Sequence, residues 1–290
     1  MSLFKRQTSG SVVCTSCGSL VGVRDEKCFS CGRRNPGMWG FAPLLRSLGN
    51  DLGFVQLVIW GNGALFAVSL LLSGGNIGLG GGNLLSILSP SGQSVFLLGA
   101  SGAIPVFGYG RWWTVLSAGW LHGSLLHIVF NLMWVRDLGP AVADVYGAGR
   151  MVVIYTVAGA CGFALSSAAG AYLPPLPLLR GAQLTLGASA SIFGLLGSLV
   201  YYGRRTGSQM VHGQALRYAI ILFVFGLIMP SVDNFAHAGG FVGGYLASRL
   251  LDPLKPERID HIAMAMLCLA AVVLAIAASV FTGMDLFPAR

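Results

Sequence analysis

Residues 262–284 read IAMAMLCLAAVVLAIAASVFTGM, a run of apolar and small residues without a charged side chain. A helix needs about 20 such residues to cross the hydrocarbon core of a bilayer, so this run predicts a membrane-spanning helix. Similar runs come earlier in the chain, at 54–72, 112–135, 151–179, 183–203, 218–231 and 234–248. We therefore predict an all-α polytopic membrane protein with seven spans; buried helices of a soluble protein are the alternative interpretation.

The composition favours the membrane interpretation. Charged residues make up 10% of the chain, whereas a soluble domain carries roughly a quarter. Apolar residues make up 54% of the chain and 42 of its 290 residues are glycine, which suits closely packed membrane helices. The same numbers exclude an ordinary soluble globule and a disordered chain.

The 18 Lys and Arg residues are distributed unevenly between the two sides of the membrane. If the seven spans alternate in direction, 15 of them lie on the side of the N-terminus, and Arg111, Arg180 and Arg290 lie on the other. The positive-inside rule then predicts a cytoplasmic N-terminus and an external C-terminus, in the inner (plasma) membrane of a bacterium. Topology and anionic lipids account for the net charge of +8, so we expect contact with the lipid bilayer and no nucleic-acid partner.

Two CxxC pairs stand in the polar head at residues 1–40: Cys14 with Cys17, and Cys28 with Cys31. A glycine after each pair allows the tight turn that directs both thiolates at one ion, and four thiolates close a tetrahedral zinc site. We predict a zinc-ribbon-like head with a structural zinc and no catalytic cofactor, because a four-cysteine site has no open position. Disulfides or a redox-active CxxC are the alternatives.

Three histidines lie in apolar runs, where an ionisable side chain is costly and therefore marks a candidate site. His122 and His127 belong to the second run, and His237 belongs to the sixth. Asn131 follows His127 by four residues, so the two share one face of a helix and could both donate to a single oxyanion.

Ser189 lies near the start of the fourth run, in the segment GASAS at 187–191. Alternating spans would place Ser189, His237 and His127 in the first turns of helices that enter from the external side, at similar depth. A hydroxyl, a base for its proton and a pair of oxyanion donors are the minimum set for acyl transfer. The pattern predicts hydrolysis of an amide or ester inside the membrane.

Three motifs carry a resemblance to a known family: HxxxxHxxxN from His122 to Asn131, GxS at 187–189, and AHxGGxxxG around His237. Over about residues 100–252 the chain resembles the rhomboid intramembrane serine proteases. The resemblance implies that Ser189 is the nucleophile and His237 the base. It also implies that His127 and Asn131 line the oxyanion hole, with His122 helping to position the oxyanion and substrate.

Several positions depart from that family's pattern. Ala190 stands where many members have glycine, so Ser191 is a competing hydroxyl. Phe193 stands where tyrosine is common and could stack on an imidazole, and Asp144 replaces the usual glutamate after the second helix. Asp233 could complete a triad, although the resemblance implies a serine–histidine dyad.

These observations predict a head at 1–40, a linker at 41–53, a six-span rhomboid-like core at 54–252, and a loop, seventh span and external tail at 253–290. The predicted function is a serine endopeptidase that cleaves transmembrane segments of substrate proteins, which would enter past the fifth run and the loop at 230–233. A catalytically silent relative that binds client transmembrane helices is the main alternative. A transporter with a histidine relay is a weaker one, because it would need acidic partners within the spans.

Overall fold

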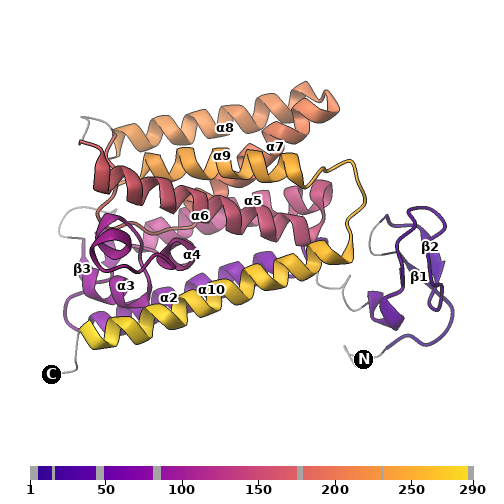
Figure 1. Ribbon diagram of the computed structural model, residues 1–290, viewed down its shortest axis with the longest axis horizontal. Helices are drawn as coiled ribbons and strands as arrows, with labels where there is room; N and C mark the ends of the chain where they lie inside the picture. Colours follow the sequence, from indigo (N-terminus) through magenta and orange to yellow (C-terminus); the bar gives the residue numbers. More distant parts are fainter. Residues whose placement is uncertain are drawn as a thin grey trace.

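The computed structural model describes residues 6–14, 17–43, 49–80, 86–174, 179–229 and 231–286. Within them, every predicted apolar run overlaps a long helix (Figure 1). These helices are α2 (Phe54–Ser73), α5 (Leu125–Tyr146), α6 (Ala148–Tyr172), α7 (Ser189–Thr206), α8 (Gln209–Ile228), α9 (Asn234–Leu250) and α10 (Ile259–Leu286). Three parts to which predictions refer lie outside the described residues: linker residues 44–48, Pro230 of the loop expected to admit substrate, and Arg290, which is expected to be external.

Four of the described helices, α2, α6, α8 and α10, are long and apolar enough to cross a membrane. A fifth span results if α5 is joined to the short helices before it, which are bent from it by 94°. The chain is therefore an integral membrane protein. Passage of α7, with 18 residues, and of α9, with 17, through the bilayer stays a prediction.

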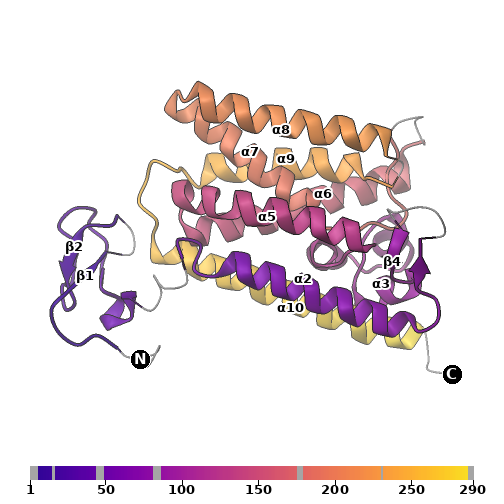
Figure 2. The same ribbon diagram turned by 180° about the vertical axis from the view of Figure 1, so that it is seen from behind.

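The shorter helices α7 and α9 pack closely with α6, with α8 on one side of the bundle and α2 and α10 on the other (Figures 1 and 2). Small residues allow this packing: Gly239, Gly240, Gly243 and Gly244 are all buried on α9. Side chains enclosed by other helices need not be as apolar as side chains that face lipid, which is consistent with the lower mean hydropathy of α7 and α9.

The second apolar run is not one helix, contrary to the prediction. It forms α4 (Thr114–Ser117) and η4 (Ala118–Trp120), and α5 begins after Ser124, whose hydroxyl accepts a hydrogen bond from His127 N at 3.3 Å. A serine N-cap starts a new helix at this point. Before these elements come β3 (Gly78–Leu79), β4 (Ile87–Ser89), α3 (Gly92–Leu98) and η3 (Ile104–Gly108), all between α2 and α5.

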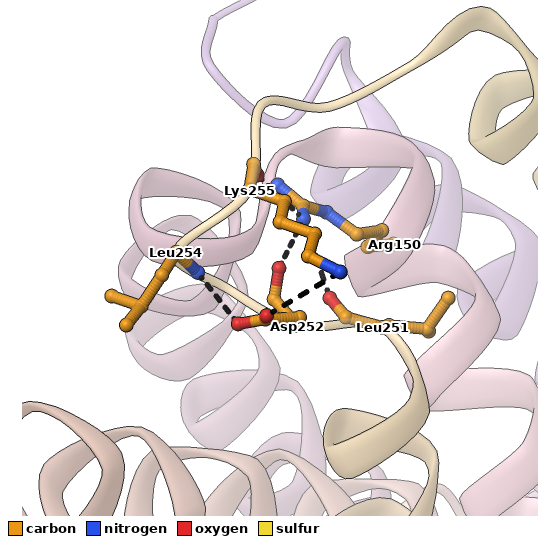
Figure 3. A network of polar contacts seen from close by, with 5 residues as sticks. All are labelled: Arg150, Leu251, Asp252, Leu254 and Lys255. Atoms are coloured by element: carbon orange, nitrogen blue, oxygen red, sulfur yellow. Dashed lines mark hydrogen bonds and ion pairs between the residues drawn. The ribbon is translucent and has the colours of Figure 1, made fainter.

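The loop between α9 and α10 is fixed to the start of α6 by a buried arginine (Figure 3). Arg150 Nη1 donates to the carbonyl oxygens of Leu251, Asp252 and Lys255 at 3.2, 2.7 and 2.9 Å. The backbone N–H of Arg150 donates to Glu257 Oε1 at 3.1 Å. The beginning of α10 is thus attached to the central helices.

The head contains an antiparallel hairpin of β1 (Ser11–Val13) and β2 (Leu20–Gly22), with Val12 opposite Val21, and the short helix η1 (Met38–Gly40). It lies beyond the end of the bundle at which α2 and α10 begin (Figures 1 and 2). Asn50 Nδ2 in the linker donates to Asp144 Oδ1 near the end of α5, at 2.6 Å. Asp144 therefore attaches the linker to the bundle, far along α5 from the histidines.

Candidate active site and cysteine cluster

Ser189 is the first residue of α7 and is half-buried. The segment before it pairs with the chain between α3 and η3: Ser101 and Thr185 exchange backbone hydrogen bonds of 2.9 and 2.7 Å. Because Ser189 opens the helix, its own N–H has no acceptor within α7. Among the described residues this N–H has no hydrogen-bond acceptor, so the serine hydroxyl and an unbonded amide lie together at the helix start.

The imidazole of His127 lies against the backbone just before Ser189. Gly187 has φ +123°, and a Cβ built on it would lie 2.6 Å from His127 Nε2. On the other side of the ring, Gly123 N donates to His127 Nδ1 at 3.3 Å. Because Nδ1 accepts, a neutral ring carries its proton on Nε2. His127 therefore directs an N–H donor at Gly187, in the segment that leads to Ser189.

Asn131 and His122 complete this polar group. Asn131 Nδ2 donates to the carbonyl of His127 at 2.7 Å, and its buried Oδ1 has no described partner. His122 precedes α5, is 1% exposed, and packs edge-on against His127 with ring centroids 5.0 Å apart. The structure thus brings His122, His127 and Asn131 together, although His122 lies in a loop.

His237 occupies the first turn of α9 and is oriented on two sides. Its Nδ1 lies 3.2 Å from Asn234 Oδ1, and its ring stacks on Phe193 of α7 with centroids 4.2 Å apart and planes 16° apart. An amide oxygen can only accept, so Nδ1 donates to it and Nε2 carries the lone pair. His237 is therefore oriented as a proton acceptor, and Phe193 stacks as the sequence predicts.

Glycines allow α7 and α9 to approach at the level of these residues. A Cβ on Gly240 would lie 2.0 Å from the carbonyl oxygen of Ala190, and one on Gly244 would lie 2.2 Å from that of Gly194. Gly240 is one turn after His237, and Ala190 directly follows Ser189. This contact brings the starts of the two helices together.

The competing groups identified in the sequence have other neighbours. Ser191 is buried, and a Cβ on Gly159 of α6 would lie 2.7 Å from its hydroxyl. The Asp233 carboxylate accepts from Ala236 N at 3.0 Å, which caps α9, and from Ser166 Oγ at 2.5 Å. Ser191 thus faces α6, while Asp233 holds α9 against α6.

Sequence reasoning did not single out Asn234 or the steric role of Gly187. Asn234 is three residues before His237, so the two share a helix face by the same periodicity that linked His127 to Asn131. The signal for Asn234 was therefore in the sequence. The contact of Gly187 with His127 joins segments about 60 residues apart, and no local pattern indicates it.

In the head, the Sγ atoms of Cys14, Cys17, Cys28 and Cys31 all lie within 4.8 Å of one another. Cys14 and Cys31 Sγ are 3.8 Å apart, and Cys17 and Cys28 Sγ are 3.6 Å apart. Zinc–sulfur bonds of about 2.3 Å in a tetrahedron place the sulfurs roughly 3.8 Å apart, so this donor set fits zinc. Gly18 and Gly32, with φ of +79° and +71°, form the two turns that the sequence predicts.

Burial raises the pKa of the Cys31 thiol to about 12. For Cys17, burial also raises the pKa, but hydrogen bonds with Ser19, Cys31 and Cys28 together outweigh it and lower the pKa to about 6. Four thiolates in one place repel each other, so a bound cation favours the state in which all four are deprotonated.

Comparison with known proteins identifies a Rhomboid domain at residues 109–253, half of the chain. The rhomboid protease GluP of Bacillus subtilis (strain 168) is 32% identical over 145 residues, which cover 49% of this chain and 26% of that protein. RHOMBOID-like protein 7 of Arabidopsis thaliana is 29% identical, covering 57% and 51% of the two chains. Rhomboid-like protease 3 of Toxoplasma gondii is 27% identical, covering 53% and 57%. The chain thus spans less than two thirds of each relative.

Proposed function

Because this chain belongs to the rhomboid family, we propose that it is an intramembrane serine protease whose nucleophile is Ser189 and whose base is His237. The observation that carries the proposal is the complementary orientation of two imidazoles. His237 has its Nδ1 bound by Asn234, which leaves Nε2 to accept a proton, while His127 has its Nδ1 bound by Gly123, which leaves Nε2–H to donate one.

In the first step, His237 Nε2 takes the Ser189 proton as Oγ attacks the carbonyl carbon of the scissile peptide bond. The carbonyl electron pair moves to oxygen. The resulting oxyanion accepts hydrogen bonds from His127 Nε2–H, from the Ser189 N–H at the start of α7, and from the Asn131 amide once it has turned away from the His127 carbonyl. Stacking on Phe193 and the bond to Asn234 hold the imidazolium in place.

In the second step, the oxyanion collapses, the carbon–nitrogen bond breaks, and His237 gives its proton to the departing amine. The ester left on Ser189 is hydrolysed by water, which His237 deprotonates before returning the proton to the serine. Half-buried Ser189 and His127 are consistent with access for water and substrate. His122 would help to hold the array through its contact with His127.

The substrates we propose are transmembrane segments of other membrane proteins. Ser189, His127 and His237 each lie in the first turn of their helices, so all three would be close to one membrane surface. We propose that this surface is external and that the head is cytoplasmic, in a bacterial plasma membrane, because 15 of 18 Lys and Arg residues fall on the side of the head. Substrate would enter beside α8, the helix at one side of the bundle.

We also propose that Cys14, Cys17, Cys28 and Cys31 bind one structural zinc ion. A zinc ion bound by four thiolates would cross-link the two turns and so stabilise a head that has only a small apolar core. The head takes no part in the chemical steps.

The test of the proposed function compares two serines of one helix. Ser189→Ala should lower the rate of cleavage of a transmembrane substrate in proteoliposomes by at least about 10⁴-fold, because the nucleophile is lost. Ser191→Ala should keep the rate within about threefold, since Ser191 faces α6. Covalent labelling of Ser189 by a fluorophosphonate provides a second measurement.

Three results would contradict the proposal. Cleavage that persists in Ser189→Ala would exclude Ser189 as the nucleophile, and loss of labelling in Ser191→Ala alone would transfer that role to Ser191. A wild-type protein that neither cleaves nor labels, but still captures transmembrane helices, would be the catalytically silent relative.

A further inference from the structure

The last helix, α10, follows the matched Rhomboid domain, yet it bonds to residues 96–118, which we call the active-site loop and which run from the end of α3 to the start of η4. Arg111 Nη2 donates to the carbonyl oxygen of Ser279 at 2.6 Å, and Trp113 Nε1 donates to Ser279 Oγ at 3.1 Å. Arg111 is 1% exposed and Ser279 is 0% exposed. A buried guanidinium is costly unless its bonds are made, so this contact fixes the two segments relative to each other.

Arg111 also bonds to the start of the same loop. Its Nη1 donates to the carbonyl oxygen of Phe96 at 2.9 Å, and its guanidinium lies 4.5 Å from the Phe96 ring centroid. A Cβ on Gly99 would lie 2.7 Å from Ser279 Oγ, and Ser117 Oγ donates to the Gly99 carbonyl at 2.8 Å. The loop thus packs on α10 at Gly99.

The next residues of this loop hold the segment that leads to Ser189. Besides the Ser101–Thr185 pair, Ala103 N donates to the carbonyl of Ala182 at 2.9 Å. At the start of η4, the Ala118 carbonyl accepts from Gly187 N at 3.0 Å. Hydrogen bonds and a packing contact, joined through the backbone of residues 96–118, therefore connect Ser279 on α10 to Gly187, two residues before the nucleophile.

The other end of α10 is fixed as well. Arg150 binds three carbonyl oxygens of the loop that precedes α10, as Figure 3 shows. With both ends attached, α10 cannot shift along its axis without breaking bonds to a buried arginine. The helix α10 is therefore held in a fixed position against the rest of the bundle.

We infer that α10 positions the nucleophile: Ser279 holds Arg111 and Trp113, these hold the loop at residues 96–118, and the loop holds the segment at residues 182–187 in front of Ser189. Ser279, Arg111 and Trp113 are positioning residues that act through this chain of contacts. The inference rests on the proposed function, because its catalytic consequence requires that Ser189 is the nucleophile.

A displacement of about 1 Å at a reacting group can lower a rate roughly 100-fold, so weakening the support should affect turnover more than binding. Ser279→Ala, which removes the acceptor of Trp113, should lower kcat by about fivefold. Arg111→Met should lower it by about 50-fold, and Arg111→Lys should recover part of that loss. KM should stay within about twofold in each variant, and the rate of fluorophosphonate labelling should fall together with kcat.

Thr282→Val is the matched control, because the Thr282 hydroxyl bonds only to carbonyls of α10 itself, those of Ala278 and Ser279, among the described residues. It should leave kcat, KM and labelling unchanged. All assays are run well below the unfolding temperature of each variant. If Arg111→Met does not fold, Ser279→Ala alone provides the test.

A second measurement does not depend on protease activity. Hydrogen–deuterium exchange of the full-length protein should be faster in Ser279→Ala at the amides of Ser101, Ala103, Thr185 and Gly187, and unchanged in Thr282→Val. Unchanged exchange, or wild-type kcat and labelling in Ser279→Ala and Arg111→Met, would overturn the inference. A different result would refute the proposed function alone: exchange is faster in Ser279→Ala, but the wild-type protein neither cleaves a substrate nor reacts with the fluorophosphonate. In that case α10 still holds the segment before Ser189 in place.

Discussion

At the scale of single residues, the candidate site depends on one position where a side chain has no space. Gly187 has a positive φ of +123°, and its α-carbon faces His127 Nε2 so closely that an added Cβ would lie 2.6 Å away. The glycine therefore allows both the backbone conformation before Ser189 and the approach of the imidazole donor. A side chain here would separate the donor from the nucleophile without changing either group.

Gly187→Ala should therefore inactivate the enzyme while both catalytic side chains remain. The strained backbone costs about 1–3 kcal/mol, and displacement of His127 should lower kcat by at least about 100-fold in a transmembrane-substrate assay. Gly207→Ala, at the other end of α7, is the control: it has φ +75° with no atom within 4 Å of an added Cβ. It should lose about 1 kcal/mol of stability and keep kcat within about twofold. Equal activity of the two variants would show that the His127 contact is unimportant.

At the scale of helices, the approach of α9 to α7 brings the first turn of α9, with His237, close to Ser189 at the start of α7. Gly240 and Gly244 place their α-carbons against carbonyl oxygens of Ala190 and Gly194, and His237 is one turn before Gly240. Helices can pack at this distance only if each of two successive turns has a glycine at the contact. The positions of Ser189 and His237 thus depend on residues without functional groups.

Gly240→Ala should push the two helices apart. Overpacking of this kind costs about 2 kcal/mol, and both the unfolding temperature in detergent and the rate of fluorophosphonate labelling should fall. Gly213→Ala on α8 is the control, because an added Cβ there has no atom within 4 Å and alanine favours a helix by about 1 kcal/mol over glycine. Its unfolding temperature should be unchanged or higher. Normal labelling in Gly240→Ala would mean that the helix contact does not set the catalytic distance.

The helices were predictable because long apolar runs have few alternatives in a bilayer, and α2 and α10 begin within three residues of the predicted runs. The second run was less predictable. Its apolar composition continues through the loop to Leu125, and the helix start depends on the serine cap at Ser124. The polar start of α8 was also missed, since Gln209 to Arg217 belong to the helix but not to its apolar part.

At the scale of the whole molecule, the chain combines a membrane bundle with a head of different chemistry. The hydrogen bonds described for residues 6–43 join residues of that segment to each other, while the linker contact of Asn50 with Asp144 belongs to the bundle. Sequence spacing predicted the cysteine group, since each CxxC forms a local turn. The contact of α10 with residues 96–118 was not predictable, because Arg111 and Ser279 are 168 residues apart.

Two separately stabilised parts should respond separately to loss of the metal. The purified protein should contain about one zinc per chain, which Cys28→Ser should abolish and Cys161→Ser, within α6, should preserve; a chromogenic chelator measures both. Because zinc binds deprotonated thiols, lowering the pH should release it. Removal of zinc should make the head sensitive to protease, whereas labelling of Ser189 and unfolding of the bundle should remain unchanged. Retained zinc in Cys28→Ser would exclude this site, and loss of labelling on chelation would show that the head supports the bundle after all.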